Sequence, residues 1–81
     1  MLESDMHAWR YGSAPEWARY TRYLQLRLQM VGIPAERVKR MWYGNPATAQ
    51  WEVSFPARMY AAATRVADAL PFPKRVSTVS A

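Results

Sequence analysis

The sequence has no cysteine and a single histidine, His7, among its 81 residues. No disulfide, thiolate metal site or thiol nucleophile can therefore form, and no second histidine offers the spacing of a metal site. Glycine is also scarce, with only Gly12, Gly32 and Gly44, which is too few for a glycine-rich phosphate loop. These absences predict a protein that is not an enzyme and that uses no metal or cofactor.

Long apolar runs are missing as well. Every mainly apolar stretch is far shorter than the roughly 20 residues that a membrane helix needs. The first residues, MLESD, are acidic, and no apolar core of a secretory signal follows them. We therefore expect a cytoplasmic protein with no membrane span.

Acidic residues are few compared with basic ones. Eleven Lys and Arg stand against six Asp and Glu, which gives a net charge of +5 and an isoelectric point of about 10.1. A small domain of this charge is typical of nucleic-acid binders. Nine of the eleven basic residues are Arg, however, so a coding bias towards Arg is an equally simple explanation.

The remaining composition favours one small folded domain over residues 1–81, because 51% of the residues are hydrophobic. Four prolines precede helix-favouring residues, and proline is common at the first position of a helix. We expect an all-α fold of four to five short helices, with helices over 15–31, 34–43, 46–53 and 56–70.

These helices define a helical core over residues 13–70. An extended or mobile segment, 1–12, precedes the core, and a basic tail, 71–81, follows it. Short terminal strands are left open, because residues 7–11 and 74–79 could pair with each other or across a dimer.

The first of these helices has two distinct faces. Its periodicity gathers Trp17, Leu24 and Leu28 on one stripe, and Gly32 lies where a left-handed residue closes a helix. The opposite face combines Arg with exposed-type apolar residues, which is typical of interfaces. Burial of the helix on two sides would give the same pattern. The candidate dimer face consists of Tyr23, Leu26 and Met30, beside Arg19 and Arg22.

The segment GNPATAQWEVSF, residues 44–55, supports two interpretations. Trp51, Val53 and Phe55 alternate with polar residues, which is typical of a strand. Its partner would be residues 34–43, where a strand places Arg40 among core residues, whereas a helix separates apolar from charged positions. We therefore expect a helix, with an α+β helix–hairpin–helix fold as the alternative.

Four stretches in this order resemble the small helix-turn-helix repressors of the Cro/cI, or lambda-repressor-like, class. They are the GIPAERV junction (32–38), the YGNPAT turn (43–48), the Trp51-Glu52 pair and the RVADAL run (65–70). The expected third helix departs from the class in carrying no Arg or Lys. The resemblance implies a DNA-binding repressor of phage or mobile-element origin that binds a short palindromic operator as a homodimer.

The same resemblance assigns roles to individual residues on double-stranded DNA. The start of the third helix would contact bases, because amides can pair with adenine and methyl groups can pack on thymine. Nearby basic residues would contact phosphates and position the protein. The expected base contacts are Asn45, Ala47, Thr48 and Gln50, and the expected phosphate contacts are Arg37, Lys39, Arg40, Lys74 and Arg75.

A second functional class fits the composition too. Arg, Trp and Tyr are enriched at the centres of protein interfaces, so the chain could be a small basic inhibitor or adaptor of phage type that docks on a host protein complex. An α+β fold with a hairpin over residues 37–55 would favour this alternative over the repressor.

Overall fold

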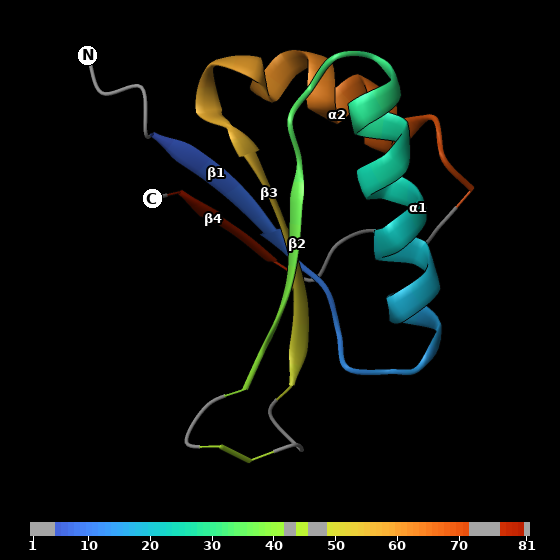
Figure 1. Cartoon of the computed structure of the whole chain (residues 1–81), viewed down its shortest axis with the longest axis vertical. Coiled ribbons are helices and arrows are strands. Elements are labelled where there is room, and N and C mark those ends of the chain that lie inside the picture. The colour runs from blue at the N-terminus through green and yellow to red at the C-terminus, as the bar shows by residue number, and fades with distance from the viewer. Residues whose placement is uncertain (1–4, 42–43, 46–48, 72–76, 81) are drawn as a thin grey trace.

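Two helices of the described chain pack on one antiparallel sheet (Figure 1). The computed structural model describes residues 5–41, 44–45 and 49–71, and the backbone of residues 77–80. Along the chain, the described elements are β1 (Met6–Arg10), α1 (Glu16–Met30), β2 (Glu36–Arg40), β3 (Gln50–Pro56), the 3-10 turn η2 (Ala57–Met59), α2 (Tyr60–Asp68) and β4 (Ser77–Ser80). The sheet order is β2-β3-β1-β4. This β-α-β-β-α-β succession is the split β-α-β topology.

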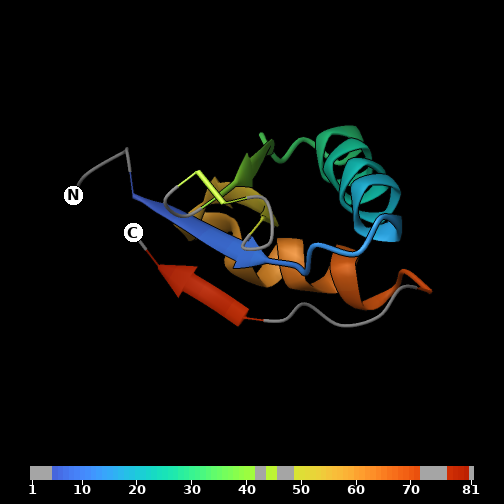
Figure 2. The same cartoon turned by 90° about the horizontal axis from the view of Figure 1, so that it is seen from below.

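Both helices cover the same face of the sheet, as the view from below shows (Figure 2). Helix α1 packs over β2 and β3, and α2 packs beside it over β3. The terminal strands β1 and β4 pair within the chain, from His7 with Ser80 to Arg10 with Ser77. No described helix covers the opposite face, which we call the helix-free face.

The core lies between the sheet and the helices. Successive side chains of β1 and β3 point to opposite faces of the sheet. Trp9, Val53 and Phe55 point towards the helices and are fully buried. The rings of Trp9 and Phe55 pack edge to face with their centroids 4.7 Å apart, a favoured aromatic geometry. From α1, Leu24 and Leu28 complete the centre of this cluster.

Helix α1 confirms the first expected helix to within a residue at each end. Gly32 has a φ of +86°, and the amide of Ile33 donates to the carbonyl of Leu28 at 2.9 Å while that of Gly32 donates to Gln29 at 3.0 Å. These two bonds form a Schellman motif. The motif turns the chain so that Ile33 enters the core, where it is buried.

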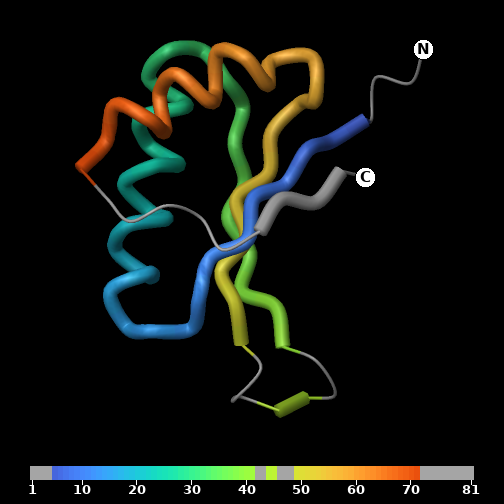
Figure 3. The backbone as a smooth tube through the Cα atoms, turned by 180° about the vertical axis from the view of Figure 1, so that it is seen from behind, coloured from blue at the N-terminus to red at the C-terminus, as the bar shows by residue number. Residues whose placement is uncertain are grey.

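The expected all-α fold is wrong. Residues 36–40 and 50–56 form the antiparallel hairpin β2–β3 (Figure 3) instead of two helices. The start of the expected third helix, residues 46–48, lies outside the described residues. The expected helix over 56–70 is reduced to η2 and α2. The fold is α+β, and without a helix over residues 50–53 it contains no helix-turn-helix at these positions.

The hairpin forms because β2 is an edge strand, not a core strand. Val38 and Arg40 lie on the helix-free face and are exposed, so a charged residue beside Val38 carries no burial cost. On the other face, Arg37 lies over the ring of Trp51, with its guanidinium carbon 4.1 Å from the ring centroid. A cation can thus occupy a position where the alternation of a strand requires an apolar side chain.

Candidate functional site

A shallow groove runs where the outer side of α1 meets β2. Its volume is about 670 Å³, which is within the range of ligand and peptide pockets. Helix α1 supplies most of its wall, and β2 supplies one residue. The lining residues are Ala18, Arg19, Tyr20, Arg22, Tyr23, Leu26 and Arg37, and we call this surface the α1–β2 groove.

Three guanidinium groups make the groove strongly positive. Among the described lining residues none is acidic, and the ion pairs recorded for the described chain involve neither Arg19 nor Arg22. Partial burial, together with the positive charge of Arg22, lowers the pKa of Arg37. Arg37 still stays protonated at neutral pH. The groove therefore concentrates like charges that an anionic group would neutralise.

Arg37 is held in place by α1 and β3. Its Nη1 donates to the carbonyl of Ala18 and lies 3.4 Å from the hydroxyl of Thr21. The hydroxyl of Thr21 itself donates to the carbonyl of Trp17 at 2.6 Å. Together with the stacking on Trp51, these contacts fix the guanidinium of Arg37. A fixed cation loses less conformational entropy on binding a partner than a free one.

The groove also exposes apolar surface. Tyr23 is 45% exposed, Leu26 44% and Met30 73%, and the first two line the groove while Met30 follows one turn later on α1. These are the three residues expected to form a dimer face. In a domain of this size, neighbouring exposed apolar residues that are framed by Arg are typical of a protein-binding surface.

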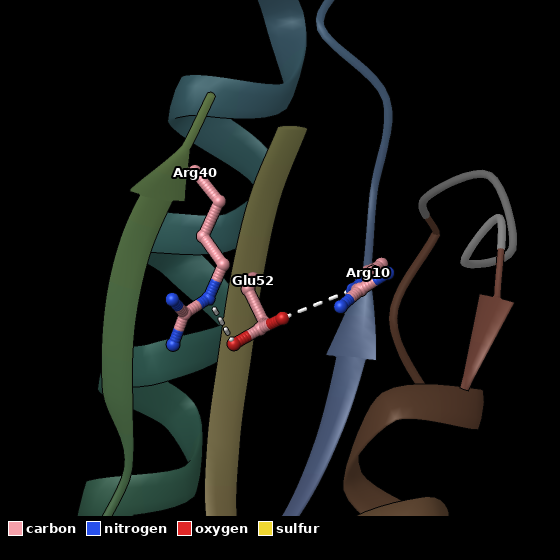
Figure 4. Close-up of polar contacts among 3 residues, drawn as sticks. All are labelled: Arg10, Arg40 and Glu52. Atoms are coloured by element: carbon pink, nitrogen blue, oxygen red, sulfur yellow. Dashed lines mark hydrogen bonds and ion pairs between the residues drawn. The ribbon is translucent and has the colours of Figure 1, made fainter. Parts of the chain in front are cut away.

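The helix-free face has a different character. Glu52 of β3 lies between two arginines and accepts hydrogen bonds from Nε of Arg10 at 3.1 Å and from Nε of Arg40 at 2.9 Å (Figure 4). Burial raises the pKa of Glu52, but the hydrogen bonds and charges of Arg40 and Arg10 outweigh it and hold this pKa below its usual value. Arg10 and Arg40 thus share one carboxylate within the chain.

Aromatic residues are missing from the described part of the helix-free face. The strand alternation places Ala8 and Arg10 of β1 there, with Glu52 and Ser54 of β3 and Val38 of β2. Proteins that bind single-stranded nucleic acid on an open sheet stack bases on aromatic side chains. The described side chains of the helix-free face therefore offer no ring on which a base could stack.

The residues expected to contact DNA do not come together. Asn45 lies in the loop after β2, Gln50 begins β3, and Ala47 and Thr48 lie outside the described residues, as do Lys74 and Arg75. Of the expected phosphate contacts, Arg40 pairs with Glu52, and Lys39 lies 5.7 Å from the ring centroid of Trp51. Of the expected phosphate contacts that the structure describes, Arg37 alone lines the groove.

Two features of the site were not predicted from the sequence. Helical periodicity placed Arg19 and Arg22 beside the expected dimer face, but nothing in the sequence showed that Arg37 joins them from β2. The pairing of Glu52 with two arginines was also missed, because residues 36–40 were read as a helix. The strand alternation of residues 51–55 was the available signal for this pairing.

Within the described residues, neither helix is long and apolar enough to cross a membrane, and no cluster of side chains suited to a metal ion occurs. Comparisons with known protein families, with curated proteins and with solved structures find no match.

Proposed function

We propose that the protein is a small, non-catalytic docking module that binds an acidic segment of another protein in the α1–β2 groove. The observation that carries the proposal is the gathering of Arg19, Arg22 and Arg37 around exposed Tyr23 and Leu26, with no acidic residue among the described lining. Arg and Tyr are the residues that most often dominate binding energy at protein interfaces. This is the inhibitor or adaptor alternative of the sequence, restricted to one surface and one partner chemistry.

A protein partner suits the groove better than DNA does. Affinity for a DNA duplex comes mainly from Lys and Arg that neutralise its phosphates, whereas this groove mixes cations with half-exposed apolar side chains. The expected reading of bases depended on a helix that begins at residue 46, and residues 50–56 form a strand. The net charge of +5 would also attract DNA, so the experiment includes a DNA duplex.

The proposal is tested by fluorescence anisotropy at low salt with three labelled probes. Two are capped acidic peptides of about ten residues. In the first, Glu, Leu and Glu occupy alternate positions separated by Thr, which favours an extended chain. In the second, the same three residues are spaced in an Ala-rich sequence so that they share one face when the bound peptide is helical. The third probe is a DNA duplex of mixed sequence. We expect at least one peptide to bind saturably.

A matched pair of double variants locates the binding. Arg19→Glu with Arg22→Glu should weaken peptide binding by at least about tenfold, or 1.4 kcal/mol. Arg58→Glu with Arg65→Glu changes the net charge equally, at exposed positions of η2 and α2 outside the groove, and should leave affinity within about twofold. Equal loss in both variants, failure of both peptides to bind, or duplex binding that is lost only in the groove variant would overturn the proposal.

A further inference from the structure

Strand β2 forms one edge of the sheet, and the hydrogen bonds of β3 show which of its backbone groups point outward. The carbonyl of Trp51 accepts from the amide of Tyr11, next to β1, at 2.7 Å. Successive residues of a strand point their backbone groups to opposite sides. The backbone N–H and C=O of Glu52 therefore point towards β2 and bond with those of its register partner Val38. The N–H and C=O groups of Arg37 and Lys39 therefore point away from the sheet.

The outward backbone of β2 lies beside the α1–β2 groove. Arg37 belongs to both, since its side chain lines the groove while its N–H and C=O face outward at the edge. A strand added to β2 would continue the sheet next to α1. Every second side chain of that strand would then face the side where Arg22, Tyr23 and Leu26 are exposed.

The charges along β2 select the occupant of this edge. Four of its five residues, Glu36, Arg37, Lys39 and Arg40, are charged, and charged edge strands resist unselective pairing. If β2 of a second copy paired antiparallel about Val38, Arg37 of each copy would lie opposite Lys39 of the other on the side of the helices. On the other face Glu36 would lie opposite Arg40, which already pairs with Glu52. Like charges directly opposite destabilise a sheet. An acidic strand would instead place carboxylates against these cations.

We infer that the acidic segment binds as an extended strand that pairs with the outward N–H and C=O groups of Arg37 and Lys39, adding to the sheet at β2. This inference rests on the proposed function and specifies the conformation of its ligand. Backbone hydrogen bonds supply affinity in this mode of recognition, and pockets for alternate side chains supply specificity. The segment carries acidic side chains towards Arg22 and Arg37 and an apolar one towards Leu26, which lies one turn beyond Arg22 on α1.

Lys39→Pro tests the pairing directly, because it removes one outward N–H. Proline is tolerated on edge strands where its nitrogen faces solvent, so the fold should persist, as circular dichroism can show. Lys39→Ala removes the same charge and keeps the N–H. We expect Lys39→Pro to bind the Thr-separated acidic peptide at least about tenfold more weakly than Lys39→Ala does. Equal affinities of the two variants would refute the pairing.

Hydrogen exchange of the unsubstituted protein gives a second measurement that does not depend on how the variant folds. Saturating peptide should slow exchange of the Arg37 and Lys39 amides, which point outward, and leave that of Val38, already bonded to β3, nearly unchanged. Unslowed exchange at both positions, with the peptide bound, would overturn the inference.

The remaining outcomes separate this inference from the proposed function. If only the helical peptide binds, and the Arg19→Glu with Arg22→Glu variant loses this binding, strand addition is refuted while the proposed docking module is supported. Failure of both peptides would remove both. A concentration-dependent dimer in sedimentation that Lys39→Pro abolishes and Lys39→Ala keeps would make a second copy the occupant, and would also overturn the inference.

Discussion

Replacing Glu52 with Gln tests how much the ion pairs of the helix-free face stabilise the fold. The carboxylate side chain is 9% exposed, and its partners Arg10 and Arg40 are 29% and 53% exposed. A hydrogen bond to a charged group contributes about 1.5–3 kcal/mol, but a solvated pair contributes only about 0–1 kcal/mol. Because Arg40 is more exposed than Arg10, the contribution of its bond to stability lies near the low end of these values, and that of the bond from Arg10 lies nearer their middle. Glu52→Gln should cost about 2 kcal/mol at pH 7.

The substitution keeps the shape of the side chain, so the loss is electrostatic. One oxygen remains as a neutral acceptor, while the new NH₂ group faces a second donor across a distance near 3 Å. For a domain of this length, about 2 kcal/mol corresponds to a fall in Tm of roughly 8–16 °C. Thermal and urea unfolding followed by tryptophan fluorescence measure the loss.

The pH dependence of the loss in unfolding free energy distinguishes an electrostatic effect of Glu52→Gln from a packing effect. Because the pKa of Glu52 is lower in the folded protein than the value of about 4.3 in an unfolded chain, its ionised form stabilises the fold above that unfolded value. The stabilisation is lost as the pH falls from about 4.3 through the folded pKa, where Glu52 becomes protonated. The difference in unfolding free energy between the protein and Glu52→Gln should therefore shrink from pH 7 towards pH 3.

Two results would refute this reasoning. One is a loss below about 0.5 kcal/mol at pH 7, and the other is a larger loss that stays constant down to pH 3. Glu36→Gln is the matched control, because Glu36 is an exposed carboxylate on the same face. A surface substitution of this kind should change stability by less than about 0.5 kcal/mol.

Two further substitutions test the core and the end of α1. Phe55→Ala should cost about 3–5 kcal/mol, which is a large part of the stability of an 81-residue domain, and loss of dispersion in an amide NMR spectrum would show it; a spectrum still well dispersed at 37 °C would contradict the assigned core. Gly32→Ala should cost about 1–2 kcal/mol in urea unfolding, because its φ of +86° is unfavourable for Ala, while no described residue other than its chain neighbours comes within 4 Å of the added Cβ. An unchanged midpoint would contradict the left-handed turn.

The sequence allowed the elements with strong local signals to be predicted. Helix α1 has two clean faces and a glycine in the left-handed conformation after it, and both were expected at nearly the right residues. The partner face of α1, with Tyr23 and Leu26, was also assigned from periodicity. Its exposure in the structure agrees with that assignment, while its role in dimerisation stays a prediction.

The hairpin could not be predicted by the same reasoning. Residues 36–40 give a helical separation of charged and apolar positions, and that pattern outweighed the strand alternation of residues 51–55. What the pattern does not contain is the packing across the sheet, where Arg37 and Lys39 lie over Trp51 and Arg40 reaches Glu52. These contacts join residues 12 to 14 positions apart along the hairpin, and tertiary contacts of this kind override local preference.

The charged residues that made β2 resemble a helix in the sequence also restrict which strands can pair with its edge. A hydrophobic β2 would have been recognised as a strand, but its free edge would also pair with any extended chain. With Arg37 and Lys39 pointing their backbone groups outward, pairing with a basic strand brings like charges together, and a second copy paired about Val38 does so at Arg37 and Lys39. Arg19 and Arg22 on α1 extend the same positive field beside the edge. For the acidic strand that we propose as ligand, the backbone and the side chains of this edge therefore act in the same direction.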